Sequence, residues 1–379
     1  MTTLSTTTKT RRGYWWLLVI GGVTVGAVGT GVVTGVIQTE VGRNEIIFTI
    51  SEPSGPPMKA HFIDVGQGDA TLLEFPCAAV LIDAGGDKQG EEDLLLYLER
   101  FFQRRKDLGN RLDSIFITHT HIDHNRALRD VVKAYDVGRY IHNGVYRGSG
   151  RHEAKWMGNN AEERSIAQLA VTQDDVAGHR YGLTNEIIDG IDCDTVDPEI
   201  FVLSGPHTEN PGWTKGEFEN GNNKSLVVLV KYGEFSMLFT GDLEDVAIDA
   251  LVDYYEGTNV LDVDLYQVGH HGSENGTTFE LLEAMTPQCA VISMGHWTDG
   301  AIPRPDGEYD SKNFTTFAYG HPRKKIVEWL SLVVSRRDKP IVVRVAHKAA
   351  HFVDYELGGA VYGTGWDGTV TLEAYPGGL

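Results

Sequence analysis

The sequence has little cysteine for its length, and its few cysteines follow no pattern. The 379 residues include Cys77, Cys193 and Cys289, an odd number with none of the spacings that mark a thiolate metal site. A chain of this length can bury a large apolar core, so a framework of disulfides is not expected. Cys77 and Cys289 lie in apolar stretches and are therefore predicted to be core residues.

Positive charge is also scarce. The chain has 33 Lys and Arg against 53 Asp and Glu, which gives a formal net charge of −20. The first 37 residues carry three positive charges and no negative one, so the rest of the chain is even more acidic. Such a field repels polyanions and works against loose binding of nucleic acid. Nucleic acid is not excluded as a partner, but the charge disfavours it.

Residues 14–37 form a long run without any charged side chain, and Lys9, Arg11 and Arg12 precede it. At about 1.5 Å per residue, a helix of this length crosses a hydrocarbon core of about 30 Å. Positive residues keep their end in the cytoplasm, so residues 1–13 are predicted to be a cytoplasmic tail. We therefore expect one N-terminal transmembrane helix that anchors the protein, with the catalytic domain outside the cytoplasm. The alternative is a signal peptide, with secretion after cleavage.

The rest of the chain is organised as a linker and one large domain. Residues 38–57 are polar and end in a proline-rich stretch, which is typical of a linker. Residues 58–379 alternate strand-like and helix-like segments and are predicted to form a single α/β domain. Residues 146–200 are rich in Gly, Asn, Asp and Glu, which indicates an insertion near the functional site.

A six-residue run, His-Thr-His-Ile-Asp-His, occupies residues 119–124. It places His119, His121, Asp123 and His124 between an apolar, β-branched stretch and a helix-like stretch. Imidazoles and a carboxylate at this density are typical of metal ligands. Without thiolates, and on an exposed strand-to-helix turn, such a set favours a catalytic ion such as zinc or manganese.

Further candidate ligands follow other strand-like segments. Asp83 ends one apolar run, Asp242 ends another, and His270 and His271 follow a third. A carboxylate at the end of a buried strand is costly unless it has a partner, and a metal ion would be one. The sequence therefore predicts that these strand ends meet the 119–124 turn in one site.

Six motifs together resemble the metallo-β-lactamase superfamily, and within it the hydrolase domain of ComEC-type competence proteins. The resemblance covers residues 58 to about 295, is to one domain of those proteins, and does not establish DNA uptake. It implies a four-layer αββα sandwich. The matching motifs in chain order are HFIDVGQGDA (61–70), LIDAGG (81–86), HTHIDH (119–124), NNKSLV (222–227), LFTGD (238–242) and VGHHGS (268–273).

The resemblance also implies roles for the candidate ligands. His119 and His121 would hold a first metal ion, and Asp123 and His124 would hold a second. Asp242 would bridge the two ions, which makes Asp123 and Asp242 the carboxylates on which catalysis depends.

Two ligand positions stay open in this scheme. Either His270 or His271 would complete the second site. In the superfamily a third histidine completes the first site, and His207 is the best candidate here, with His142 a weaker one.

Residues around the ligands are assigned supporting roles. In the loop 64–69, Asp64 and Asp69 bracket glycines that bring the backbone close to the site, and together with Asp83 they are expected to hold ligands by hydrogen bonds. Asn222 and Ser225 either position substrate or cap the strand that follows them.

Two divalent ions about 3.5–4 Å apart can share a hydroxide and clamp an attacked oxygen, so no side-chain nucleophile is needed. The expected function is metal-dependent hydrolysis, and the ComEC-like motifs favour a phosphodiester as the substrate. Small esters, lactams or thioesters are alternative substrates. A non-catalytic, membrane-associated binding module is the alternative from another class, and the complete set of ligands argues against it.

Overall fold

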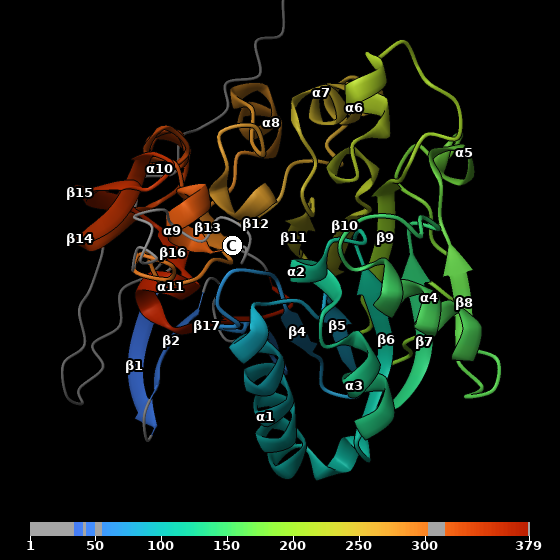
Figure 1. Ribbon diagram of the computed structural model, residues 1–379. Coiled ribbons are helices and arrows are strands. Elements are labelled where there is room, and N and C mark those ends of the chain that lie inside the picture. Colours follow the sequence, from blue (N-terminus) through green and yellow to red (C-terminus); the bar gives the residue numbers. More distant parts are fainter. Residues whose placement is uncertain (1–33, 41–42, 50–54, 302–314, 378–379) are drawn as a thin grey trace, which may run out of the picture.

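The computed structural model describes residues 34–40, 43–49, 55–301 and 315–377 (Figure 1). Two β-sheets form its centre. The larger sheet has nine strands in the spatial order β1 (Thr34–Glu40), β2 (Arg43–Thr49), β17 (Thr369–Ala374), β3 (Met58–Phe62), β4 (Thr71–Glu74), β5 (Ala79–Ile82), β6 (Arg111–Ile117), β7 (Asp136–His142) and β8 (Ala167–Ala170).

The smaller sheet has six strands, in the order β16 (Val361–Gly363), β13 (Cys289–Ile292), β12 (Leu265–Gln267), β11 (Phe235–Phe239), β10 (Val227–Tyr232) and β9 (Pro198–Ser204). A separate antiparallel pair consists of β14 (Arg336–Lys348) and β15 (His351–Gly359).

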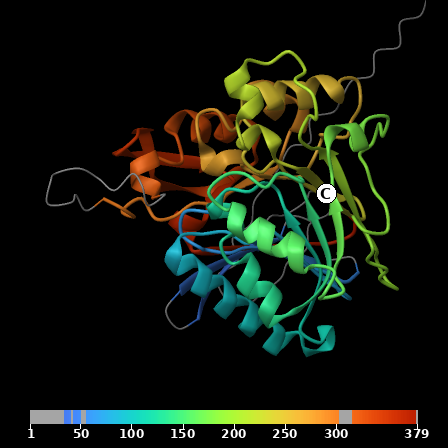
Figure 2. The same ribbon diagram turned by 45° about the vertical axis from the view of Figure 1, so that its right-hand side comes forward.

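Helices cover the outer faces of both sheets (Figure 2). The larger sheet is covered by α1 (Lys88–Arg104), α3 (Leu128–Ala134) and α4 (Arg151–Asn160). The smaller sheet is covered by α7 (Asp245–Tyr254), α8 (Phe279–Met285) and α10 (Lys324–Val333). The short helices are η1 (Lys106–Leu108), α2 (Ile122–Asn125), α5 (Gln173–Val176), α6 (Lys215–Glu219), η2 (Asn222–Lys224), η3 (Gly269–Gly272), α9 (Thr316–Tyr319) and α11 (Thr364–Asp367).

The alternation of side chains along β5 explains the layers. Val80 and Ile82 belong to the core between the two sheets, while Ala79 and Leu81 belong to the core under the helices. Successive side chains of a strand point to opposite faces, so a strand that is apolar at every position needs a layer on each side. The predicted αββα sandwich is confirmed by this arrangement.

The strand ends that carry the candidate ligands lie at one edge of the sandwich. β5, β6 and β7 run parallel in the larger sheet, and β11, β12 and β13 run parallel in the smaller one. The turns after these strands are tightly packed: a Cβ on Gly85 would lie 1.6 Å from the carbonyl oxygen of Asp123. Only glycine fits there, which is why this motif brings two loops into contact.

The N-terminal segments differ from the sequence prediction where the structure describes them. The sheet begins at Thr34 rather than at residue 58, because β1 and β2 form an antiparallel hairpin and β2 pairs in parallel with β17. Residues 34–37, predicted to be the end of the membrane helix, are therefore strand, and so is part of the predicted linker. Residues 14–33 of the predicted membrane helix lie outside the described residues. Among the helices that the structure does describe, none combines the length and apolarity needed to span a bilayer.

Residues 146–200, predicted to be an insertion, contain regular elements. α4 packs beside α3, and β8 extends the larger sheet by pairing in parallel with β7. Ser149, just before α4, lines the cavity of the candidate site. The region therefore borders the site at its start and continues the sandwich beyond it.

The prediction that Cys77 is a core residue is wrong. Cys77 lies exposed in the turn between β4 and β5 and forms a disulfide with Cys193, which is 116 residues away. The apolar residues near Cys77 in the sequence belong to the strands on either side of the turn. The apolar stretch therefore gave a wrong prediction for the turn residue itself. Cys289 is a buried free thiol in β13, as predicted.

Hydrogen bonds among the largely buried side chains of His61, Glu74 and Arg105 connect α1 to the larger sheet. Glu74 at the end of β4 lies 3.0 Å from Nε2 of His61 on β3, and its other oxygen accepts a 2.7 Å hydrogen bond from Arg105 at the end of α1. Burial alone would raise the pKa of Glu74, but these partners lower it to about 2. The carboxylate is therefore ionised over the whole range in which the protein is expected to be folded.

We predict that Glu74→Gln lowers the free energy of unfolding by roughly 1–3 kcal/mol at pH 7, because Gln cannot accept the same charge-assisted hydrogen bonds. The pKa of this carboxylate is depressed in the folded state, so its contribution is complete above about pH 4.5 and is lost as the pH falls towards 2. Denaturant unfolding at pH 7 and pH 3 checks this. Glu163→Gln, at an exposed position, is the control; a difference that grows on acidification would contradict the prediction.

Candidate metal centre

The candidate site is a cavity of about 320 Å³ at the edge where the strand ends meet. Both halves of the sandwich contribute to its wall, along with the segment before α4 and the segment around α9. The lining residues are Gln67, His121, Asp123, Ser149, Asn222, Asp242, His270, His271, Tyr319 and His321.

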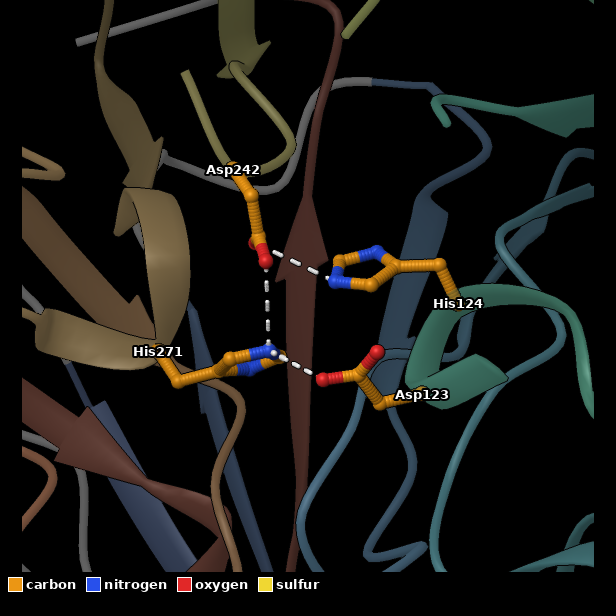
Figure 3. A group of neighbouring side chains, drawn as sticks. All are labelled: Asp123, His124, Asp242 and His271. Atoms are coloured by element: carbon orange, nitrogen blue, oxygen red, sulfur yellow. Dashed lines mark ion pairs between the residues drawn. The ribbon is translucent and has the colours of Figure 1, made fainter. Parts of the chain in front are cut away.

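Four buried side chains form what we call the second ligand group: Asp123, His124, Asp242 and His271 (Figure 3). Each offers one ligand atom, and these atoms lie within 4.8 Å of one another. Nε2 of His124 is 3.1 Å from Oδ1 of Asp242, and Nε2 of His271 is 3.5 Å from Asp123 and 3.7 Å from Asp242.

His119, His121 and Asp242 form the first ligand group, under the same 4.8 Å limit. Nε2 of His119 lies 3.1 Å from Nδ1 of His121 and 3.7 Å from Oδ2 of Asp242. Asp242 belongs to both groups. Its Oδ1 lies beside His124, and its Oδ2 lies 3.7 Å from both His119 and His271. The bridging role of Asp242 stays a prediction.

Ligand atoms of the second group are buried without hydrogen-bond partners in the described part of the chain. They are Oδ1 of Asp123, Nε2 of His124, Oδ1 of Asp242 and Nε2 of His271. Their near polar neighbours are one another, as with Nε2 of His124 and Oδ1 of Asp242 at 3.1 Å. A buried polar atom without a hydrogen bond costs about 1–3 kcal/mol, so a cluster of four favours a bound ligand. Convergent nitrogen and oxygen lone pairs of this kind fit a divalent ion such as zinc or manganese.

Hydrogen bonds to the far side of each imidazole fix which nitrogen faces the centre. Nδ1 of His124 lies 2.7 Å from Oδ2 of Asp83, and Nδ1 of His271 donates to the carbonyl oxygen of Ser293 at 2.8 Å. In both rings Nε2 is left for a metal, which is the usual arrangement of metal-binding histidine. Asp83 is itself held by the backbone and hydroxyl of Thr118, each at 2.8 Å.

The two carboxylates of the loop 64–69 make different contacts. Asp69 accepts a hydrogen bond from the amide of Gln267, and its backbone N–H donates to the carbonyl of Asp123 at 2.9 Å. Asp64 is outside the described ligand groups; its Oδ1 accepts from the backbone N–H of Gly66 at 3.3 Å and stabilises the turn. Asp69 and Asp83 thus lie close to the candidate ligands, and Asp64 contacts the backbone of its own loop. The supporting role of each stays a prediction.

Burial and charge act in opposite directions on the carboxylates. Burial, and then the neighbouring Asp83, raises the pKa of Asp69 to about 6. Burial would also raise the pKa of Asp242, but His124 and His271 hold it well below its ordinary value. Asp242 is therefore ionised, which is the state that metal binding by a carboxylate requires.

The structure distinguishes the paired histidines. His271 belongs to the second ligand group, and His270 does not. Nε2 of His270 lies 3.8 Å from Asp242 and 3.4 Å from the amide nitrogen of Asn222, and its Nδ1 is 3.9 Å from Glu244. Both histidines have positive φ, 50° and 54°, which directs two adjacent side chains to different parts of the wall.

Asn222 and Ser225 have separate positions. Asn222 lines the cavity and donates a 2.8 Å hydrogen bond to Glu244, which leaves its Oδ1 buried and unpaired among the described residues. Ser225 accepts from the backbone N–H of Asp242 at 3.1 Å, so it positions a ligand and does not line the cavity.

Neither candidate for a third histidine joins the first ligand group in the described part of the molecule. The ring of His207 packs edge-on against Trp213, with centroids 5.1 Å apart. His142 accepts a 3.0 Å hydrogen bond from the backbone N–H of Gly144 and stacks on Tyr140.

Four lining residues were not identified from the sequence: Gln67, Ser149, Tyr319 and His321. His321 is 6% exposed, and its ring stacks on that of Tyr319 with centroids 5.6 Å apart. Both residues follow the stretch 302–314 and lie far along the chain from the metal motifs. The only feature of the sequence that sets His321 apart is the proline that follows it.

Curated proteins with similar sequences include ComE operon protein 3 of Bacillus subtilis, 26% identical over 310 residues, and Recombination protein 2 of Haemophilus influenzae, 28% identical over 275 residues. These matches cover 76% and 71% of this chain but 33% and 28% of the relatives, so the chain spans about a third of their length. The predicted resemblance to ComEC-type competence proteins is thereby confirmed.

Among solved structures, the metallo-beta-lactamase fold protein YhfI from Bacillus subtilis is 13% identical and has a TM-score of 0.37, covering 62% of this chain and 85% of that one. The model of one family matches residues 63–296, which is more than half of the chain and includes the residues of both ligand groups. The chain therefore belongs to the metallo-beta-lactamase superfamily.

Proposed function

We propose that this hydrolase of the metallo-beta-lactamase superfamily holds two divalent ions, zinc or manganese, and hydrolyses phosphodiesters. The observation that carries the proposal is the sharing of Asp242 between two ligand groups whose atoms converge on one cavity. Two adjacent ions are the arrangement that suits in-line displacement at phosphorus.

Each ion would be held by its own side chains together with the shared Asp242. His119 and His121 would hold the first ion, and Asp242 would contribute an oxygen to both. Asp123, His124 and His271 would hold the second. When bound, two such ions lower the pKa of a water molecule towards about 7 and neutralise charge on the attacked group.

The chain itself orients these ligands and shapes the space beside them. Asp83 holds the imidazole of His124, and Ser225 holds the backbone of Asp242. Asn222 and His270 line the cavity without belonging to either ligand group, so they are placed to contact substrate.

Two considerations bear on the bond class. Relatives are named for competence and recombination, which supports a phosphodiester over an ester, lactam or thioester. The net charge of −20 disfavours long polyanions. A short phosphodiester is therefore the substrate that we favour.

Metal content tests the two-ion site directly. We expect elemental analysis of the full chain, purified with ample zinc or manganese, to find close to two divalent ions per molecule. Asp242→Ala should reduce this to one or none, because both ligand groups lose an oxygen. Asp253→Ala, at an exposed position on α7, should change nothing. One tightly bound ion in the wild type would indicate a mononuclear site.

Activity tests the bond class. We expect bis-p-nitrophenyl phosphate to be cleaved with manganese or zinc and protected by a chelator. Asp242→Ala should lower the rate at least about a thousandfold, since several kcal/mol of transition-state stabilisation depend on the ions.

Two results would count against this function. Cleavage that survives Asp242→Ala would come from a contaminant. Metal-loaded protein that is inert on phosphodiesters but cleaves an ester, thioester or lactam would assign another bond class, and inertness on all of them would favour a binding module.

For localisation, we propose that residues 14–33 cross a membrane and hold the catalytic domain outside the cytoplasm. These residues carry no charge, three basic residues precede them, and 20 residues span about 30 Å as a helix. Protease added to intact cells should digest the domain and spare a cytoplasmic marker. Protection of the domain would refute the orientation, and release into the medium would indicate secretion.

A further inference from the structure

One polar residue of the cavity wall, His321, belongs to neither of the two ligand groups. His321 lies between α9 and α10 and lines the cavity together with Asp123, Asp242 and His271. Its ring centroid is 5.8 Å from that of His270 and 6.3 Å from that of His271. It belongs to neither ligand group. The imidazole is thus beside the reacting centre without being part of it.

The backbone around His321 is fastened to its surroundings. The N–H of His321 donates to the carbonyl of Thr316 at 3.3 Å, and the N–H of Arg323 donates to the carbonyl of Gly272 at 2.8 Å. The carbonyl of Pro322 accepts from Ala346 at 2.8 Å. These bonds join the segment to η3, which carries His271, so His321 has a fixed position relative to the ligands.

One of the two ring nitrogens of His321 is unsatisfied within the described protein. Nδ1 is buried and has no hydrogen-bond partner in the part of the chain that the structure describes. A phenylalanine could stack on Tyr319 equally well and would avoid the cost of an unpaired buried nitrogen. The imidazole of His321 is 94% buried and lines a cavity. A polar ring in such a place indicates a contact with a ligand.

We propose that His321 donates a hydrogen bond from Nε2 to the leaving-group oxygen of the substrate, an inference that rests on the proposed phosphodiesterase function. Nδ1 is out of contact with solvent, so Nε2 is the ring nitrogen that a substrate can reach. His321 lies outside both ligand groups and lines the same cavity, so its ring is free to contact a substrate and does not bind an ion in this scheme.

The reaction that this contact assists is a simple hydrolysis. A hydroxyl group from water bonds to phosphorus, and the bond from phosphorus to the leaving oxygen breaks with its electron pair remaining on that oxygen. The remaining proton of the water ends on the leaving group by way of solvent. A hydrogen bond from His321 stabilises the negative charge while it develops.

The test is a series of aryl methyl phosphates whose leaving phenols run from p-nitrophenol to phenol. A good leaving group such as p-nitrophenol needs little stabilisation of its developing negative charge. His321→Phe should therefore lower kcat for the p-nitrophenyl substrate less than about threefold. For phenol as the leaving group, the loss of a hydrogen bond to developing charge should lower kcat about ten- to a hundredfold. KM should change little across the series.

Two variants separate chemistry from packing. His321→Gln keeps an N–H close to the place of Nε2 and should restore much of the rate with the poor leaving group. His347→Phe, on the exposed part of β14, should leave the whole series unchanged. Metal content should be the same in wild type and in both His321 variants, and the thermal midpoint of His321→Phe should be no lower than that of the wild type.

Each other outcome has a definite meaning. An equal loss for all leaving groups, or no loss at all, would overturn the role of His321 while the wild-type activity upheld the proposed function. Loss of metal in His321→Gln would make the residue a support for ligands and would also overturn the inference. Wild type that cleaves no member of the series would refute the proposed function itself, and this inference with it.

Discussion

The geometry of the site depends on the buried carboxylate of Asp242. It is 3% exposed, and imidazoles from the turn after β6 and from η3 surround it. The turns that carry it and His271 are joined, because the backbone N–H of His270 donates to the carbonyl of Gly241 at 3.0 Å. Gln267 of the smaller sheet donates to Asp69 of the larger one. The packing of two sheets thus sets the distances between the ligands.

Much of the site could be predicted because its signals are local. His119, His121, Asp123 and His124 are nearly contiguous, so their clustering needs no knowledge of the fold. Asp242 ends an apolar strand, and the end of a strand is visible in the pattern of side chains. The four layers were implied by the resemblance of six motifs to a known family, and strands that are apolar on both faces, such as β5, agree with it because they need cover on both sides.

Other features depend on contacts that no local pattern encodes. The choice of His271 over His270 follows from two left-handed backbone conformations in succession. His321 reaches the cavity through the packing of its segment on η3, and Cys77 meets Cys193 across 116 residues. The strands β1 and β2 were missed because their place depends on pairing with β17, more than 300 residues later in sequence.

That pairing has a consequence for how the domain comes together. β17 lies between β2 and β3 and forms backbone hydrogen bonds with both. It therefore connects the first hairpin to the rest of the larger sheet. Until residues 369–374 have been synthesised, β3 presents an unpaired edge and the hairpin has nothing to dock on. A nascent chain therefore has an unpaired strand edge while the residues between β3 and β17 are synthesised, and its larger sheet can be completed only after β17 has emerged.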